Sequence, residues 1–319
     1  MALGLLRDQA LDLAEISKDQ FYYNPKEGKQ GKRASKSTKY RKAGSWDIVD
    51  NQEVVEKIKT QLSQRDMNYG YRKMSYFLQQ SGYLINHKKV YRLMKEHSLL
   101  QAKKVSAQKN YVKYRIVVPN RPLEVLEMDI KQIWVEEQRR YAYNLTILDT
   151  FTRAALYFTV GYNMRQTQVK QAWEYVIEHY LQPADALNRK LHIEVRNDNG
   201  PQFSAKMIQK FFEENGLNQM FTHPYTPQEN GHVESFHGIL AKHLNRQTFW
   251  TLEHLEQDLT LFYERYNNTR IHASIAYLSP HDFWKLWEIE QIERIEKAKN
   301  KVQFKLKIPY YKLKETLLT

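Results

Sequence analysis

The sequence predicts an α/β protein, a mixed sheet with flanking helices, preceded by small α-helical segments of helix-turn-helix type. Three observations predict this class. Residues 123–160 contain three successive runs rich in β-branched and aromatic residues, which are typical of paired strands. A helical pattern, another strand and a second helical pattern follow, and this order indicates a mixed sheet with helices on its faces. Residues 46–100, by contrast, have helical periodicity.

The composition indicates a folded protein that binds a polyanion. Its 319 residues include 49 Lys and Arg against 36 Asp and Glu, a net charge of +13, with 42% hydrophobic residues. This excess favours nucleic acid over an acidic small molecule as partner. No cysteine is present, which excludes disulfides, thiolate zinc sites and cysteine nucleophiles. No apolar run has the length of a membrane span and no signal pattern follows Met1, so we expect a cytoplasmic protein without a membrane partner.

Changes in charge and periodicity divide the chain into six parts. They are a short helical segment that fits a helix-turn-helix remnant (1–24), a basic linker (25–45), a helical DNA-binding domain (46–100), a second basic linker (101–120), an α/β core (121–285) and a basic C-terminal helix and strand (286–319). The first linker has too few apolar residues to bury a core, so we expect a flexible tether. It either stays solvated or contacts phosphates, and the two are compatible.

The third helix of the 46–100 segment has two opposite faces. Asn86 is a good N-cap for the stretch HKKVYRLMKEH. Lys88, Arg92 and Lys95 share one face, and the other face is apolar, with Val90, Leu93 and Met94. A helix that reads the major groove of DNA needs this arrangement. The same basic face also serves to keep an ordinary helix soluble, and the segment alone leaves both interpretations open.

The core is predicted as a meander followed by alternating helices and strands. Turn-like breaks at 136–138 and 149–152 separate its first three strands, which favours antiparallel pairing. A helix is expected over about 165–181, a strand over 191–195, and a helix over about 204–215 that Gly216 ends.

Three carboxylates of this core have unusual positions. Asp129 lies inside an apolar strand, where a charge is costly unless it is paired or binds a metal. Asp198 follows the strand at 191–195 in the turn DNG, at the kind of sheet edge where α/β proteins bind ligands. Glu234 lies near the start of a helix, beside its apolar face. Singly, each has a simpler role, as a paired core charge, a turn former or an acid that matches the helix dipole.

Together, the three acids predict a different chemistry. A strand, a strand end and a helix can bring residues that are far apart in sequence to one point. Oxygen ligands without cysteine select hard cations such as Mg²⁺ or Mn²⁺. Two such ions, about 4 Å apart, activate a water or a 3′-hydroxyl and stabilise the leaving oxygen of a phosphoryl displacement.

Four sequence words around these acids carry a family resemblance. They are MDIKQIW, NDNGPQF, HPYTPQENGHVESFHG and YNNTRIHASIAYLSP, with 35 residues between Asp198 and Glu234. With them, residues 50–285 resemble the retroviral-integrase-type DDE transposases, and more narrowly the second reading frame, OrfB, of the bacterial insertion-sequence family numbered three. The resemblance implies a ribonuclease H-like integrase core, Mg²⁺-dependent DNA strand cleavage and strand transfer, and Asp129, Asp198 and Glu234 as ligands of two metal ions.

The resemblance also suggests DNA contacts outside the three acids. Asn230 lies in the matched loop before the last acid and Arg270 in the matched word after the core, and we expect both to contact DNA. The family often has a basic residue seven positions after the last acid, where this chain has Ala241, with Lys242 next to it. One position turns a helical side chain by about 100°, so we expect Lys242 to reach a phosphate from a different angle.

Three functions follow as hypotheses. The first is an active transposase that cuts at terminal inverted repeats and joins 3′-hydroxyls to target DNA by direct transesterification, which makes it a polynucleotidyl transferase. The others are a catalytically silent DNA-binding regulator of the element and a general ribonuclease H-like nuclease. For the transposase we expect double-stranded DNA as substrate, a homo-oligomer of at least two chains on DNA, an upstream OrfA partner where this chain does not recognise the ends alone, and a bacterial, nucleoid-associated location.

Some features have bland interpretations. His223, His232 and His237 surround Glu234, but their spacing and the missing cysteines argue against zinc. Asp149 is expected to form a strand-end turn instead of acting as a fourth ligand. After residue 286, a charged amphipathic helix and a surface strand of alternating basic and apolar residues are expected, and packing on a partner, on DNA or on the core stays open.

Overall fold

The computed structural model describes residues 4, 6–23, 34–42, 44–102, 117–223, 227–245, 247–298 and 301–318. The chain divides into two compact units, residues 1–36 and residues 37–319, and each is described by itself. None of the described helices combines the length and the apolar character that crossing a membrane requires.

The first unit consists of two short helices, α1 (Arg7–Leu13) and α2 (Lys18–Phe21). Ser17 caps α2, because its hydroxyl accepts a hydrogen bond from the Gln20 N–H. Leu11 is the one buried residue that the two helices contribute in the described part of this unit. The interpretation of this segment as a helix-turn-helix remnant stays a prediction.

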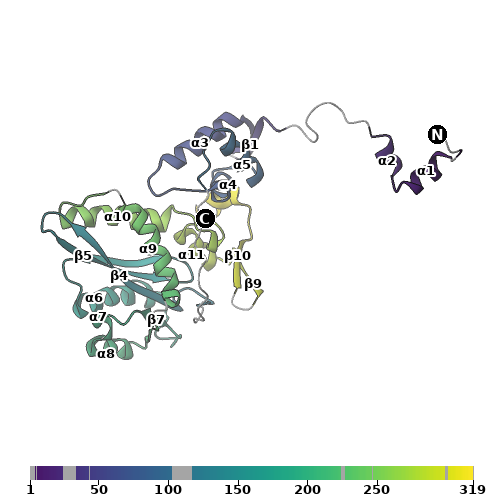
Figure 1. Ribbon diagram of the computed structural model, residues 1–319. Helices are drawn as coiled ribbons and strands as arrows, with labels where there is room; N and C mark the ends of the chain where they lie inside the picture. The colour runs from purple at the N-terminus through teal and green to yellow at the C-terminus, as the bar shows by residue number, and fades with distance from the viewer. Residues whose placement is uncertain are drawn as a thin grey trace. The chain divides into compact units, whose positions relative to one another are not determined.

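The second unit begins with a small helical region (Figure 1). Its elements are β1 (Ser37–Lys42), β2 (Ser45–Asp50), α3 (Asn51–Ser63), α4 (Tyr71–Gln80), β3 (Tyr83–Leu84) and α5 (His87–Glu96). The three predicted helices are confirmed, including the N-cap, because Oδ1 of Asn86 accepts from the Lys89 N–H at 2.9 Å. Apolar faces of the three helices form one core that includes Ile58, Met74 and Val90.

The prediction of a linker over residues 25–45 is wrong at its C-terminal end. Residues 37–42 form β1, the central strand of a sheet with the order β2-β1-β3. The basic side chains of β1 do not prevent strand formation, because backbone hydrogen bonds hold the sheet together. Tyr40 pairs with Tyr83 of β3, and their rings lie 4.8 Å apart against the helical core. Residues 25–33 and 43 of that linker and 103–116 of the second one lie outside the described residues.

The core is built on a five-stranded sheet with the order β6-β5-β4-β7-β8. The strands are β4 (Val125–Val135), β5 (Arg140–Asp149), β6 (Ala155–Gly161), β7 (Glu194–Asn197) and β8 (Asn218–Phe221). The predicted meander is confirmed, since β4, β5 and β6 pair antiparallel. β7 and β8 add to β4 in parallel, which makes the sheet mixed as predicted.

Helices cover both faces of this sheet (Figure 1). On one face, Leu126 and Met128 pack against α6 (Gln166–Val176), its π-helical extension η1 (Ile177–Leu181) and α8 (Lys206–Glu214), which α7 (Pro201–Ser204) precedes. On the other, Ile133 and Val135 pack against α9 (Gly231–Leu244) and α10 (Leu252–Asn268). A 3₁₀ turn, η2 (Pro227–Asn230), leads into α9. Alternate residues of β4 thus serve opposite faces.

The C-terminal segment corrects one predicted element. After η3 (Ala273–Ile275) and α11 (Pro280–Glu288), residues 292–298 form β9 (Ile292–Ala298) instead of the expected helix. β9 pairs antiparallel with β10 (Lys301–Leu306), and this tertiary pairing outweighs the helical pattern of its charges. Strand β10 itself was predicted. The C-terminal tail consists of this hairpin, η4 (Tyr310–Lys312) and α12 (Leu313–Leu318). It packs on η3 and α11 through Ile292, Leu306 and Leu313, so of the three open alternatives the structure shows packing on the core.

Candidate active site

Asp129 lies in the middle of β4, on the face that α9 and α10 cover. Ile133 and Val135, at alternate positions of the same strand, point into that layer. Oδ1 of Asp129 accepts from the Ile130 N–H at 2.8 Å, and Oδ2 lies 3.1 Å from Nδ1 of His237. The Asp129 side chain is 26% exposed, so this carboxylate is paired and still reachable from solvent.

Asp198 lies at the adjacent strand end. The predicted strand at 191–195 is shifted toward the C-terminus, so that Asp198 directly follows β7. β4 and β7 are parallel, with Val125 opposite Glu194 and Glu127 opposite Arg196. Continued by two residues, this register brings Asp198 level with Asp129, at a strand spacing of about 4.8 Å.

The electrostatics agree with this proximity. Partial burial and the nearby Asp129 charge raise the pKa of Asp198, while a hydrogen bond from the Gly200 N–H to Oδ1, at 2.9 Å, opposes the rise. That bond also makes Asp198 a turn former, so the simpler role is confirmed alongside the shared location. At Gly200, a Cβ would lie 3.0 Å from Oδ1 of Asp198. A side chain at this position would therefore press on the carboxylate of Asp198 and on the side chain of Gln202.

Glu234 lies in the first turn of α9 and is exposed. His237, which contacts Asp129, follows three residues later on the same helix face. The structure therefore brings Asp129 and Asp198 together and places α9 beside them. Among the described residues, no three Asp, Glu or His side chains are arranged so that they could hold a metal ion, so Glu234 does not complete a ligand set with the two aspartates in this conformation.

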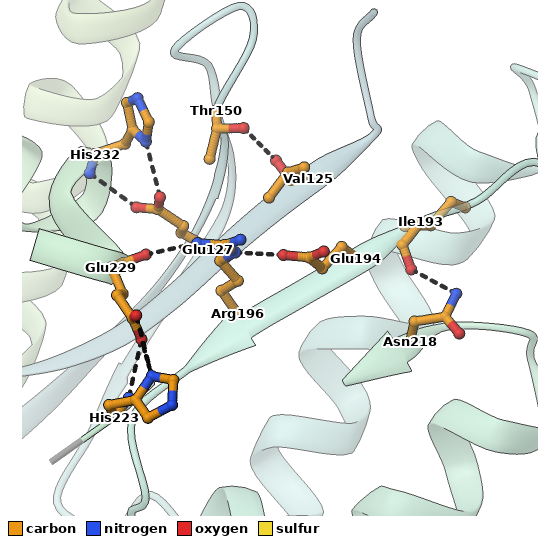
Figure 2. A network of polar contacts seen from close by, with 10 residues as sticks. All are labelled: Val125, Glu127, Thr150, Ile193, Glu194, Arg196, Asn218, His223, Glu229 and His232. Carbon is orange, nitrogen blue, oxygen red and sulfur yellow. Dashed lines mark hydrogen bonds and ion pairs between the residues drawn. The ribbon is translucent and has the colours of Figure 1, made fainter. Parts of the chain in front are cut away.

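Glu127 joins β4 to the start of α9, and the sequence analysis missed it. Its side chain is completely buried, and Oε2 accepts from the backbone N–H of His232 (2.9 Å) and of Val233 (2.7 Å). Oε1 lies 2.8 Å from Nδ1 of His232, as Figure 2 shows. Burial raises the pKa of Glu127 to about 7, against the lowering effects of the Val233 N–H and of Arg153 and Arg196. The sequence contains a signal for Glu127, because it is an acid two residues before Asp129 and therefore lies on the same face of the strand.

A second network, buried except for the exposed side chain of His223, ties His223 and Glu229 to β7 (Figure 2). Arg196 pairs with Glu194 of the same strand, and its Nη1 donates to the Glu229 carbonyl at 3.2 Å. The Glu229 carboxylate accepts from the His223 N–H at 3.0 Å and contacts Nδ1 of the same residue. Both described ends of the loop before α9 are therefore anchored near Asp198.

Asn230 is not placed for the predicted DNA contact. It is 6% exposed, and its side-chain amide donates to the Met128 carbonyl at 3.3 Å. The residue immediately before α9 is thus held on β4, because the loop folds inward at this point. In this conformation Asn230 positions the helix instead of facing solvent.

The remaining predicted residues lie at three places. On α5, Lys88 and Lys95 are exposed and Arg92 lies 3.7 Å from Glu96, while Val90, Leu93 and Met94 are buried. Lys242 is exposed near the end of α9. Arg270 follows α10 and its Nη1 donates to the Asp66 carbonyl.

The histidines and Asp149 have clear partners. His223, His232 and His237 each contact a different carboxylate, those of Glu229, Glu127 and Asp129. Asp149 is confirmed as a turn residue, since its carboxylate accepts from the N–H groups of Thr152 (2.8 Å) and Leu123 (3.1 Å).

Comparisons with protein families match two parts of the chain. Residues 119–227 and residues 215–280 each match a family described as Integrase core domain. Residues 49–106 match a family described as HTH-like domain. The matched stretches include the helical region and the five-stranded sheet with Asp129, Asp198 and Glu234.

Curated relatives come from bacterial insertion elements. The chain is 27% identical over 288 residues to "Putative transposase InsK for insertion sequence element IS150" of Escherichia coli, which covers 86% of this chain and 92% of that protein. It is 26% identical over 233 residues to "Insertion element IS407 uncharacterized 31.7 kDa protein" of Burkholderia multivorans, with 72% and 80% covered. It is 24% identical over 251 residues to "Transposase for insertion sequence element IS904" of Lactococcus lactis, with 74% and 95% covered.

Solved structures of retroviral integrases are also similar. The catalytic core domain of BIV integrase gives a TM-score of 0.38 at 20% identity, over 53% of this chain and 97% of that one. The HTLV-2 integrase catalytic core domain in complex with magnesium gives 0.34 at 17% identity, over 52% and 96%.

Proposed function

We propose that this chain, which matches the integrase core family and is similar to transposases of insertion elements, cuts DNA at the ends of its element and joins the freed 3′-hydroxyls to target DNA. The observation that carries the proposal is the register of β4 and β7, which sets the carboxylates of Asp129 and Asp198 level on neighbouring strands. Burial and the Asp129 charge raise the pKa of Asp198, and a divalent cation between the two would relieve their repulsion.

The proposed chemistry is direct transesterification at phosphorus. A water oxygen attacks the phosphodiester at the element end, and the bond from phosphorus to the 3′-oxygen breaks. The resulting 3′-hydroxyl attacks a phosphodiester of target DNA, so one P–O bond forms as another breaks and no external energy source is needed. No covalent intermediate with the protein is involved.

Asp129, Asp198 and Glu234 are the proposed ligands of two Mg²⁺ or Mn²⁺ ions, since hard cations take carboxylate oxygens. When bound, such ions activate the attacking oxygen and stabilise the leaving one. Asp198 is held in place by the Gly200 N–H and Asp129 by His237. Glu234 is carried by a helix whose first turn Glu127 fixes to β4, and from that turn its side chain would complete the set when the ions bind.

A strand-transfer assay with labelled element ends and Mg²⁺ tests the proposal. Wild-type protein should join the ends to target DNA, and Asp198→Asn should not. Glu213→Gln, which removes an exposed acid of α8 on the other face of the sheet, is the matched control and should remain active. Equal products from wild type and Asp198→Asn would show that these acids do not carry the catalysis, and no product from wild type would favour the silent DNA-binding regulator.

Binding specificity separates the transposase from a general nuclease. A transposase should bind terminal-repeat duplexes more tightly than random duplexes, whereas a nuclease should bind both equally. Lys88, Arg92 and Lys95 are the proposed contacts of α5, supported by the exposure of both lysines.

Light scattering with and without paired ends would test the proposed oligomer of at least two chains. Adding the upstream OrfA protein to the same samples would test that partner, and imaging of tagged protein would test nucleoid association.

A further inference from the structure

Strand β4 has a free edge beyond the point where its pairing with β7 ends. β7 pairs with β4 only from Val125 to Glu127, whereas β5 pairs with it as far as Val135. Within the described residues, one edge of β4 therefore has no neighbouring strand after Glu127. Such an edge presents a row of backbone N–H and C=O groups that can pair with another strand.

The even-numbered residues of β4 direct their backbone groups to this free edge. The C=O of Glu124, just before β4, accepts from the Glu194 N–H of β7 at 2.8 Å. The N–H of Glu136, just after β4, donates to the Phe249 C=O at 2.9 Å. Successive residues of a strand direct their backbone groups to opposite sides. The even-numbered residues between these two therefore point away from β5.

Two of these residues have unused backbone groups. The C=O of Met128 accepts from the side-chain amide of Asn230 at 3.3 Å, so it is already occupied. In the part of the chain that the structure describes, the N–H and C=O groups of Gln132 and Trp134 have no hydrogen-bond partner. They recur at about 6.8 Å, twice the rise per residue, which is the repeat that an added strand also has.

A hollow of about 480 Å³ follows the free edge. Ile133 and Trp134 both line it, although side chains at successive positions of a strand point to opposite faces. The end of α9 and residues 247–249 form the other wall. Lining from both faces of β4 places this hollow at the edge of the sheet, and its volume lies in the range of about 300–1,000 Å³ that ligand sites have.

Aromatic surface is exposed at the same edge. Trp134 is 40% exposed and Tyr141, its neighbour on β5, is 49% exposed, with ring centroids 5.1 Å apart. Exposed apolar surface of this kind marks interaction sites when it is contiguous. An added strand at the free edge would cover part of the Trp134 ring.

The charge of the hollow is positive. Lys131 and Lys242 line it, and Glu136 is the one acid among its described lining residues. Neither lysine forms an ion pair within the described ranges. Lys131 is separate from the residues proposed above to contact DNA. Complementary charge therefore favours an occupant with acidic side chains.

We propose that an extended peptide segment of a partner protein pairs with the free edge of β4 as an additional strand. Its acidic side chains would face Lys131 and Lys242, and its apolar side chains would lie beside Trp134. Backbone hydrogen bonds supply affinity in this mode of recognition, and the alternate side chains supply specificity. The free stretch accommodates about five residues, the usual length of a strand. A DNA backbone fits less well, because phosphates only accept hydrogen bonds and would leave the C=O groups of the edge unpaired.

Peptide binding to the full chain, without DNA or metal, tests the proposal. The probe is a fluorescein-labelled peptide of about six residues that alternates glutamate and valine, and the control peptide alternates lysine and valine. By fluorescence anisotropy, wild type should bind the glutamate peptide more tightly. Lys131→Glu should weaken that binding about tenfold, because attraction becomes repulsion, and should favour the lysine peptide. Lys210→Glu, on exposed α8, should behave as wild type.

Amide hydrogen exchange, followed by NMR, tests the strand pairing itself. Saturating glutamate peptide should slow exchange at Gln132 and Trp134 at least about tenfold, because their N–H groups become hydrogen-bonded. Exchange at Lys131 and Ile133, whose N–H groups point to β5, should not change. Binding through side chains alone would not produce this alternation.

Three results would overturn the proposal. The first is no binding of the glutamate peptide, or binding that leaves the Gln132 and Trp134 amides unprotected. The second is weaker binding of duplex DNA by Lys131→Glu with no peptide binding, which would make DNA the occupant. The third is a dimer in light scattering that Lys131→Glu dissociates, which would make a second copy of the chain the occupant. A failure of strand transfer would leave this site unaffected, since the peptide assay contains neither DNA nor metal.

Discussion

The two ends of helix α9 differ in the charge that surrounds them. At its N-terminus, Glu127, Asp129 and Asp198 gather in an otherwise basic chain. At its C-terminus, Lys242 shares its surroundings with Lys73 and Arg270. Each arrangement matches the helix dipole, which favours anions at the first turn and cations at the last. Each end therefore has a charge excess that would suit one part of the proposed metal-dependent reaction on DNA.

The largest effect is expected at the acidic end. Asp129→Asn should reduce strand transfer about a thousandfold, the upper scale for one preorganised electrostatic group. Its free energy of unfolding should not fall correspondingly, because the substitution relieves repulsion with Asp198. Parallel strand-transfer and urea-unfolding measurements check this. A loss of activity that follows a loss of stability would show that Asp129 is a structural charge, and the comparison would lose its catalytic meaning.

A stability effect is expected at the other end of α9. His243→Leu removes the imidazole that joins the carboxylates of Asp66 and Asp258 and leaves them only Arg265 and Arg65 as partners, which should cost about 3 kcal/mol. Urea unfolding should show the loss, and His254→Leu, on the exposed side of α10, should leave unfolding unchanged. An unchanged midpoint for His243→Leu would mean that the contacts of His243 with Asp66 and Asp258 do not hold the helical region to α9.

A smaller loss is expected from Glu127→Gln. The amide oxygen can still accept from one N–H of α9, but it lacks the charge that serves His232 and Val233, so we expect a loss of about 1–2 kcal/mol. Strand transfer should then need more Mg²⁺, because Glu234 is less well positioned. Glu137→Gln, in the exposed turn after β4, is the control. Glu127→Gln with the Mg²⁺ dependence of wild type would separate this carboxylate from the active site.

The last effect concerns pH and Lys73. Its pKa falls from 10.5 to about 8 on folding, so between these values the unfolded chain binds more protons and the free energy of unfolding rises with pH. The stability gained by Lys73→Gln should therefore be largest below pH 8 and disappear near pH 10.5. Differences between wild type and variant across this range check the sign. A gain that is constant with pH would mean that Lys73 does not lie beside the positive charges of Arg270 and Lys242.

The sequence predicted the fold where local pattern and tertiary structure agree. The helices over 51–96 and the meander of β4 to β6 follow directly from their periodicity. β1 and β9 were missed, because their charged residues carry a linker-like or helical pattern, while backbone pairing with the strand that follows each of them makes them strands. The propensity of a single segment does not include this pairing.

The sequence allowed the two aspartates of the candidate site to be predicted, but not the residues that hold them and helix α9 in position. Asp129 and Asp198 were identified from an unusual charge and a turn, and the strand register explains how they come together. Glu127 and His237 were missed as positioning residues, because their roles depend on contacts between β4 and α9. The burial of Asn230 reversed an expectation for the same reason, since only the folded loop shows that its amide points at Met128.

The parallel register of β4 and β7 has a consequence for how such a chain can change its length. Residues added between Leu181 and Ile193 would lengthen a surface turn and leave Asp198 level with Asp129. One residue added within β7 would carry Asp198 past Asp129 and reverse the faces of the strand. Insertions and deletions should therefore be tolerated before Ile193 and rejected between Glu194 and Asp198. The length of this short strand thus determines where Asp198 lies relative to Asp129.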